Sequence, residues 1–117
     1  GLQQAVEALL DKHSLDYQLD WAVSGEPFLT QPGALTKAVT EAVQAEMGFE
    51  PELSTSGGTS DGRFISPWGS PGSHSVEVVE LGPRNATIHK LNECIDIKEM
   101  LPLTYMYQRI IKKLLLA

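Results

Sequence analysis

Apolar residues near the start of the chain follow two different spacings. The first of them recur every three or four positions, which predicts a helix that begins at Leu2 and ends near the positive charge of Lys12 and His13. From Tyr17 to Val23, apolar and polar residues alternate. This two-residue period predicts a strand with one buried face and one solvated face.

A break follows the predicted strand. The run from Ser24 to Pro27 contains glycine and proline, and Pro32 and Gly33 come soon after it. Such residues interrupt regular structure, so we expect a domain boundary or hinge here. The expected division assigns residues 1–25 to the end of one domain and residues 26–117 to a second domain.

The apolar pattern after the break predicts one long helix and two short strands. An apolar stripe from Leu35 to Met47 indicates a helix that Gly48 ends. Short strands are expected at residues 52–56 and 76–81. With the first helix and strand, this alternation of element types predicts an α/β fold.

The last quarter of the chain predicts a C-terminal helix. The run Asp96–Glu99 has the spacing of a capping box, and apolar residues at helical spacing follow it. Proline cannot lie deep in a helix because it lacks an amide hydrogen. We therefore expect either a separate first turn or a helix that begins at Pro102.

The composition narrows the possible partners. The 117 residues carry a formal net charge of −6, which argues against binding to a nucleic-acid backbone, since such binding selects basic surfaces. No apolar run reaches the ~20 residues that cross a bilayer, and the N-terminus lacks the features of a signal peptide. We expect neither a nucleic-acid nor a membrane partner.

Two further features concern the origin of the chain. It begins with Gly1 instead of methionine, directly before the first predicted helix, as an excised fragment or a processed protein does. Its single cysteine, Cys94, can form neither an internal disulfide nor a thiolate metal cluster. A reducing cytoplasm is therefore the expected location.

Small polar residues are densest from Ser56 to Arg63, in the order Ser-Gly-Gly-Thr-Ser-Asp-Gly-Arg. Glycines let the backbone approach a ligand, and successive amide groups at a helix start can bind an anion. Arg63 could add a bidentate clamp for a carboxylate. The run lacks the Gly-Lys-Ser/Thr of a nucleotide-binding loop. A glycine-rich turn with a structural arginine remains the alternative.

A second candidate site follows the strand expected at residues 76–81. His89 lies in a loop with Asn92 and Glu93, and an imidazole nitrogen is a good zinc ligand whose other nitrogen needs an orienting acceptor. A catalytic zinc takes about three protein ligands, so one histidine is not a site. From spacing alone, an ordinary histidine stays the alternative. No nucleophile-elbow serine is present, and we expect Cys94 to pack as a small apolar group.

Three ordered motifs resemble the succinyl-diaminopimelate desuccinylase family, which belongs to the aminoacylase and carboxypeptidase clan of di-zinc amidohydrolases. They are Trp21–Thr30, Leu53–Ile65 and Val79–Glu93. The resemblance implies the C-terminal part of a zinc-peptidase-like α/β catalytic domain. The last helix and strand of an α+β dimerisation domain would precede it. It also implies a cytoplasmic homodimer active in lysine and diaminopimelate biosynthesis.

The resemblance also implies roles for individual residues. His89 would bind one of two Zn²⁺ ions, with Co²⁺ able to replace one of them. The substrate would be a small N-succinyl amino acid, N-succinyl-LL-2,6-diaminopimelate. Its contacts would be Arg63, the backbone at Gly58 and Thr59, Ser24, and Asn85.

The chain also departs from the family pattern. The family's other metal ligands and its general base, a glutamate, match nothing in this sequence, so we expect the isolated chain to be inactive and to hold zinc weakly. Residues 66–75 form a longer link than the family's, which favours a tolerated surface insertion over a cover for the active site. Two other functions remain open: a deacylase of another N-acyl amino acid such as acetylornithine, and a non-catalytic module. Such a module would bind anions or pair through residues 17–23.

Overall fold

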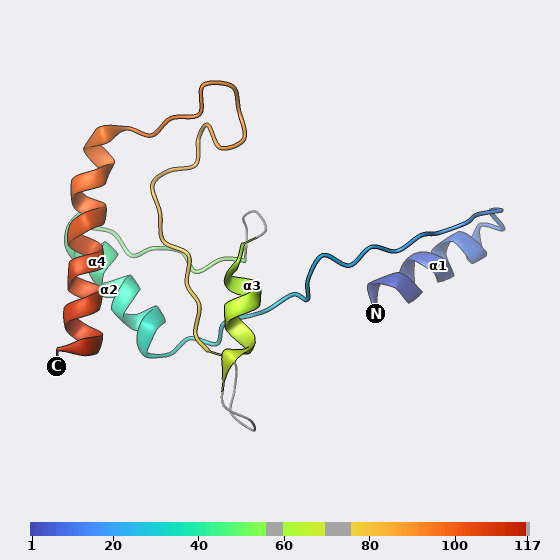
Figure 1. The fold of residues 1–117 in the computed structure, drawn as a ribbon, viewed down its shortest axis with the longest axis horizontal. Helices are drawn as coiled ribbons and strands as arrows, with labels where there is room; N and C mark the ends of the chain where they lie inside the picture. The colour runs from blue at the N-terminus through green and yellow to red at the C-terminus, as the bar shows by residue number, and fades with distance from the viewer. Residues whose placement is uncertain (56–59, 70–75, 117) are drawn as a thin grey trace.

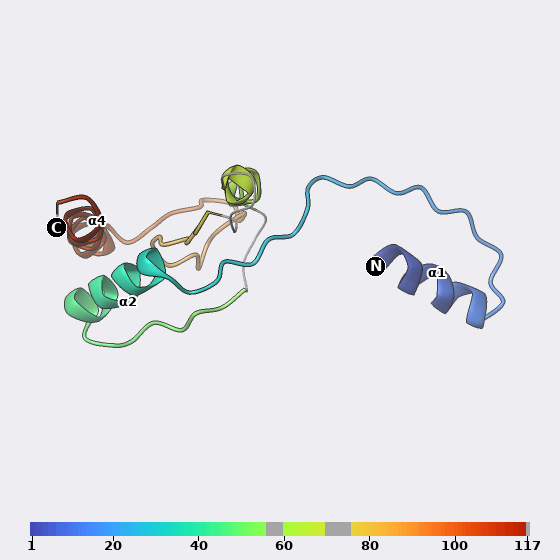
Figure 2. The ribbon, with the colours of Figure 1, turned by 90° about the horizontal axis from the view of Figure 1, so that it is seen from below.

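The computed structural model describes residues 1–55, 60–69 and 76–116, and in these residues every regular element is helical. In chain order the elements are α1 (Leu2–Lys12), α2 (Ala34–Met47), α3 (Gly62–Ile65), η1 (Ser66–Trp68), η2 (Ile97–Glu99) and α4 (Met100–Leu115). Here η denotes a 3-10 helix. Figures 1 and 2 show α2 and α4 side by side, whereas α1 lies on an arm that reaches away from them.

The arm consists of α1 and an extended segment that returns beside it. Two hydrogen bonds hold the return: the Tyr17 hydroxyl donates to Asp11 at 2.9 Å, and the Trp21 indole donates to Glu7 at 3.4 Å. No residue of α1 is buried. The predicted helix is confirmed, and the arm rests on polar contacts instead of an apolar core.

The structural core lies between α2 and α4. The residues that form it are Ala38, Val39, Ala42, Val43, Met106 and Ile110. Ion pairs join the same two helices at their edges, from Arg109 to Glu46 and from Lys113 to Glu41. Gly48 ends α2 in the left-handed conformation, at φ 77°, as the sequence predicts.

The segment at 76–81 attaches to the start of α2 through side chains. Thr30 Oγ1 donates to the Val78 carbonyl at 2.6 Å and accepts from the Val78 amide at 3.2 Å. The Glu77 carboxylate accepts from the amides of Leu35 and Thr36 at 3.0 and 3.2 Å, and from the Thr36 hydroxyl at 3.0 Å. Glu77 therefore supplies the N-terminal cap that α2 otherwise lacks, since its N-cap residue is Gly33.

The approach to α4 follows the first of the two expected arrangements. Asp96 accepts from the Lys98 amide at 2.9 Å and caps the short η2, and α4 then begins at Met100, so the first turn is separate. The second half of the expected capping box does not form. The Glu99 carboxylate instead accepts from the Arg84 amide at 2.9 Å and pairs with its guanidinium.

The predicted strands are not formed in the part of the chain that is described, so the α/β arrangement stays a prediction. Residues 17–23, 52–55 and 76–81 have no regular secondary structure, and the trace through them is extended (Figure 1). A strand is defined by hydrogen bonds to a neighbouring strand, and these segments do not pair with one another. The α/β sheet expected from the sequence is therefore not formed among these residues.

With no sheet formed among the described residues, the chain is open. Its radius of gyration is 19.3 Å, against about 13 Å for a compact domain of about 100 residues. Large apolar side chains are exposed along it, among them Leu2 at 80%, Leu91 at 96% and Ile97 at 82%. None of the described helices combines the length and the apolar content needed to cross a bilayer.

Candidate functional site

His89 lies on a loop that side-chain and backbone hydrogen bonds close. The Thr87 hydroxyl donates to the Cys94 carbonyl at 2.7 Å and accepts from the Cys94 amide at 2.9 Å. Two turns shape the tip: the Ile88 amide donates to the Asn85 carbonyl at 3.1 Å, and the Lys90 amide donates to the Thr87 carbonyl at 3.0 Å. The loop therefore has a defined shape even though it is exposed.

The backbone at the tip of this loop is unusual. His89 has a φ of 60° and Asn92 a φ of 59°, both in the left-handed region that residues other than glycine seldom adopt. His89 is exposed, so its imidazole is open to a ligand. The expected orienting contacts do not form among the described residues, where no hydrogen bond joins His89 to Asn92 or Glu93.

The donor set bears on whether a metal ion fits here. A catalytic zinc needs about three protein ligands. Within residues 1–55, 60–69 and 76–116, no group of three His, Cys, Asp or Glu side chains lies close enough to hold an ion. The described residues therefore fit one ligand of such a site, His89, and not a complete site.

Arg63 lies beside the expected hinge. A Cβ atom added at Gly25 would lie 2.7 Å from Arg63 Cδ and 2.9 Å from Arg63 Nε, so the arginine side chain packs on the backbone next to Ser24. Its guanidinium carbon stands 4.7 Å from the centre of the Phe64 ring. The structure thus brings together two segments that the sequence singles out separately.

The polar atoms of Arg63 are incompletely paired. Its Nε is buried and has no hydrogen-bond partner among the described residues. Buried polar groups are normally hydrogen-bonded, so this donor is available to an acceptor such as a carboxylate. Gly58 and Thr59, which are expected to act with Arg63, lie outside the described residues.

The two candidate regions are separate in this structure. Figure 1 shows the loop that carries His89 and Asn85, in orange, well apart from α3, which carries Arg63. Asn85 is exposed at the start of that loop and Ser24 is exposed on the extended segment. The chain alone therefore does not gather the predicted metal ligand and the predicted substrate contacts into one cavity.

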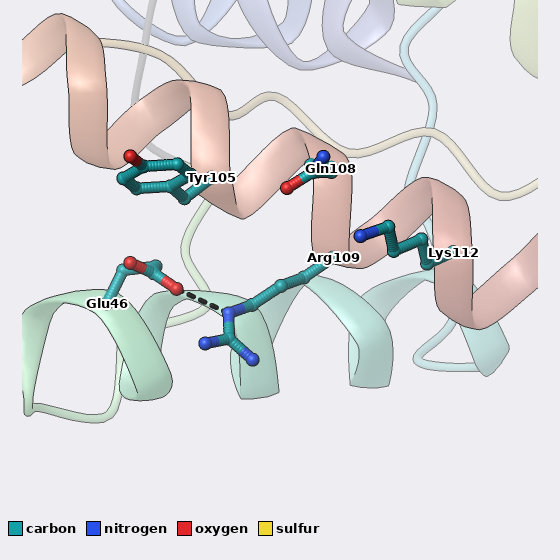
Figure 3. Close-up of a pocket in the computed structure, with 5 residues that line it drawn as sticks. All are labelled: Glu46, Tyr105, Gln108, Arg109 and Lys112. Carbon is teal, nitrogen blue, oxygen red and sulfur yellow. Dashed lines mark hydrogen bonds and ion pairs between the residues drawn. The ribbon is translucent and has the colours of Figure 1, made fainter.

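A hollow on another part of the surface lies between α2 and α4. It has a volume of about 440 Å³, and Figure 3 shows its lining: Glu46, Tyr105, Gln108, Arg109 and Lys112. The pair of Glu46 and Arg109 spans it. Of the residues predicted to bind metal or substrate, those that the structure describes do not line this hollow.

Sequence reasoning missed three side chains that shape these regions. Thr30 and Glu77 fix the segment 76–81 to α2 and to the residues just before it, across more than 40 residues of sequence, and no local pattern marks such contacts. Thr87 closes the His89 loop, and in the sequence only its position two residues before the histidine pointed to that role. Several hydrogen bonds lower the pKa of Glu77 below its usual value, and the bond from the Leu35 amide has the largest effect.

Comparison with known proteins places the chain in a family. Residues 4–113 match the family described as Peptidase family M20/M25/M40. Proteins named succinyl-diaminopimelate desuccinylase are similar to nearly the whole chain. The protein from Bordetella petrii is 53% identical over 116 residues, which is 99% of this chain and 29% of that protein. The protein from Polaromonas is 51% identical over 114 residues, which is 97% of this chain and 25% of that protein.

A third relative, from Bordetella pertussis, is 52% identical over 99% of this chain and 29% of its own length. The chain thus spans between a quarter and a third of the length of these curated relatives. The motifs that resemble a zinc-peptidase-like amidohydrolase and the match over residues 4–113 agree. The chain belongs to peptidase family M20/M25/M40.

Proposed function

We propose that these 117 residues are one segment of a succinyl-diaminopimelate desuccinylase. The observation that carries the proposal is the identity of 51–53% with proteins of that name over nearly the whole chain. The reaction is hydrolysis of the amide in N-succinyl-LL-2,6-diaminopimelate to succinate and LL-diaminopimelate. It belongs to lysine and diaminopimelate biosynthesis in the cytoplasm.

The proposed cofactor is a pair of Zn²⁺ ions, with Co²⁺ able to replace one, and His89 is the ligand this chain supplies. Exposure of His89 at the tip of a closed loop supports that role. When bound, such ions polarise the succinyl carbonyl and lower the pKa of a water molecule. The remaining ligands and the general base come from residues outside this chain. The 117 residues alone therefore hydrolyse no substrate and bind zinc weakly.

The proposed substrate contacts are Arg63, the backbone at Gly58 and Thr59, Ser24 and Asn85. The unpaired Nε of Arg63 supports its role, because a carboxylate would satisfy that buried donor. Arg63 packs on Gly25, which adjoins Ser24 in the chain, and this supports a joint role for Arg63 and Ser24. The Asn85 backbone carbonyl accepts from the Ile88 amide in the loop that carries His89, and this supports a substrate contact at Asn85 close to the metal ligand.

The proposed architecture is an α/β catalytic domain in which residues 26–117 complete a sheet, with residues 1–25 as the end of a dimerisation domain. The arm formed by α1 and its returning segment supports a separate unit at the N-terminus (Figure 1). Exposed apolar residues on the arm, including Trp21 at 44% and Val23 at 68%, support further contacts there. The complete enzyme is a homodimer in this proposal.

The test uses the protein as its gene encodes it, supplied with zinc. We expect it to release succinate from N-succinyl-LL-2,6-diaminopimelate and to lose that activity on chelation of the metal. A higher kcat/KM on N-acetylornithine would instead identify a deacylase of another N-acyl amino acid. Absence of hydrolysis under every metal condition would refute the amidohydrolase reading.

The exposed edge at residues 17–23 favours a second candidate function. An unpaired extended segment with apolar side chains can add to the sheet of another chain. In that case the chain is a non-catalytic module that pairs through residues 17–23 or binds anions. Such a module shows no metal-dependent hydrolysis, so the same assay separates the two functions.

A further inference from the structure

The loop around His89 depends on one hydroxyl group. All residues from Gly82 to Lys98 are described, and Thr87 is the only one among them that is partly buried. Its side chain closes the loop. Its Oγ1 lies 2.7 Å from the Cys94 carbonyl oxygen and 2.9 Å from the Cys94 amide nitrogen. A single side chain therefore satisfies both polar groups of the opposite backbone.

This pairing encloses the two strained positions. Residues 88–93 lie between Thr87 and Cys94, and both left-handed residues, His89 and Asn92, are among them. Left-handed backbone at a non-glycine residue persists only where surrounding contacts enforce it. The Lys90 ammonium adds a second brace by donating to the Ala86 carbonyl at 2.8 Å, but that side chain is long and exposed.

We propose that Thr87 is a positioning residue whose hydroxyl holds His89 in its left-handed conformation and so fixes the direction of the imidazole. The inference rests on the proposed function for its catalytic consequence, since an aimed imidazole matters to a metal ligand. The two hydrogen bonds to Cys94 carry the effect. Groups that orient a metal ligand typically contribute 10–100-fold to metal affinity or activity.

Three substitutions separate this role from general stability. Thr87→Val keeps the branched shape and removes the hydroxyl, whereas Thr87→Ser keeps the hydroxyl. The matched control is Thr104→Val, because Thr104 Oγ1 donates to the Met100 carbonyl at 2.8 Å within α4, away from the loop. Each variant is made in the protein as its gene encodes it.

The first measurement concerns the loop itself. In Thr87→Val we expect faster hydrogen exchange at the Cys94 amide and a weaker proton contact between the His89 amide and its own Hα, which is strong at positive φ. Thr87→Ser and Thr104→Val should keep the wild-type values. Unchanged exchange and an unchanged His89 conformation in Thr87→Val would overturn the proposal.

The second measurement concerns the metal and the reaction. We expect Thr87→Val to lower the affinity for Zn²⁺ alone, and to lower kcat on the succinylated substrate about 10–100-fold with little change in KM. Its Tm should match that of Thr104→Val, and Thr87→Ser should recover most of the loss. Equal zinc affinity and kcat in Thr87→Val and Thr104→Val would overturn the positioning role. If the wild-type protein hydrolyses nothing, the proposed function fails, and the exchange data still decide whether Thr87 holds the loop.

Discussion

Replacing Glu77 with glutamine removes a negative charge from the N-terminus of α2. The carboxylate accepts hydrogen bonds from the amides of Leu35 and Thr36 and from the Thr36 hydroxyl, and a Cβ at Gly33 would lie 2.7 Å from its carboxyl carbon. The first amides of a helix have no partner within the helix, and the helix dipole favours an anion there. Glutamine keeps one acceptor oxygen and loses the charge.

The magnitude follows from these two contributions. Loss of a charge at an exposed helix N-terminus destabilises by about 0.3–1 kcal/mol, and complete loss of a cap, as in Glu77→Ala, by about 0.5–2 kcal/mol. Salt screens the charge because Glu77 is only partly buried, so the lower end applies at high ionic strength. The control is Glu80→Gln, since Glu80 is exposed on the same segment. We expect about 0.5 kcal/mol or less for that change.

The pH dependence has a defined sign. The Leu35 amide lowers the folded-state pKa of Glu77 below its ordinary value of 4.5. A group with a lowered folded pKa contributes stability above its unfolded pKa and loses it as the pH falls through the folded value. Urea unfolding followed by circular dichroism should therefore show Glu77→Gln less stable than wild type at pH 7. The two should converge below about pH 4.5. A difference that persisted unchanged at pH 3, or one no larger than that of Glu80→Gln, would refute this account of the cap.

Two further predictions concern the substrate and the core. Arg63→Lys removes the buried Nε donor and should raise KM for the succinylated substrate roughly tenfold or more, with a smaller effect on kcat. The reason is that hydrogen bonds to charged groups contribute about 1.5–3 kcal/mol. An unchanged KM in steady-state assays would show that Arg63 does not bind the substrate. Met106→Ala should lower the free energy of unfolding in urea by about 2–5 kcal/mol, since Met106 is buried between α2 and α4. Gln108 is exposed on the same helix, so Gln108→Ala should change this free energy by about 0.5 kcal/mol or less.

The helices could be predicted because their determinants are local. Apolar residues at helical spacing predicted α1, α2 and α4, and the structure contains all three. Gly48 ends α2 and Asp96 caps the start of η2, as their sequence positions indicated. The strands could not be confirmed because a strand depends on its neighbour as well as its own pattern. Apolar and polar residues alternate over residues 17–23 as in a strand. In the structure, however, this segment contacts α1 through side-chain hydrogen bonds and forms no backbone pairing with another described segment.

The candidate site divides in the same way. His89 and Arg63 stand out through the motifs that surround them, and the family match over residues 4–113 agrees with those motifs. The contacts that shape their surroundings could not be predicted. Glu77 reaches Leu35 across 42 residues, and Gly25 faces the Arg63 side chain across the expected hinge. Such pairings depend on the path of the whole chain, which no short window of sequence contains.

The most direct test of the central claim compares His89→Ala with His13→Ala in the protein as its gene encodes it. His13 is an exposed histidine at the end of α1 and serves as the matched control. We predict that His89→Ala lowers bound zinc per subunit and reduces succinate release by at least about 10–100-fold, whereas His13→Ala changes neither. A loss of about 10–100-fold is typical when a residue that only orients a metal ligand is replaced, so loss of the ligand itself should cost at least as much. Equal zinc content and equal succinate release in the two variants would contradict the assignment of His89 as a metal ligand of a desuccinylase.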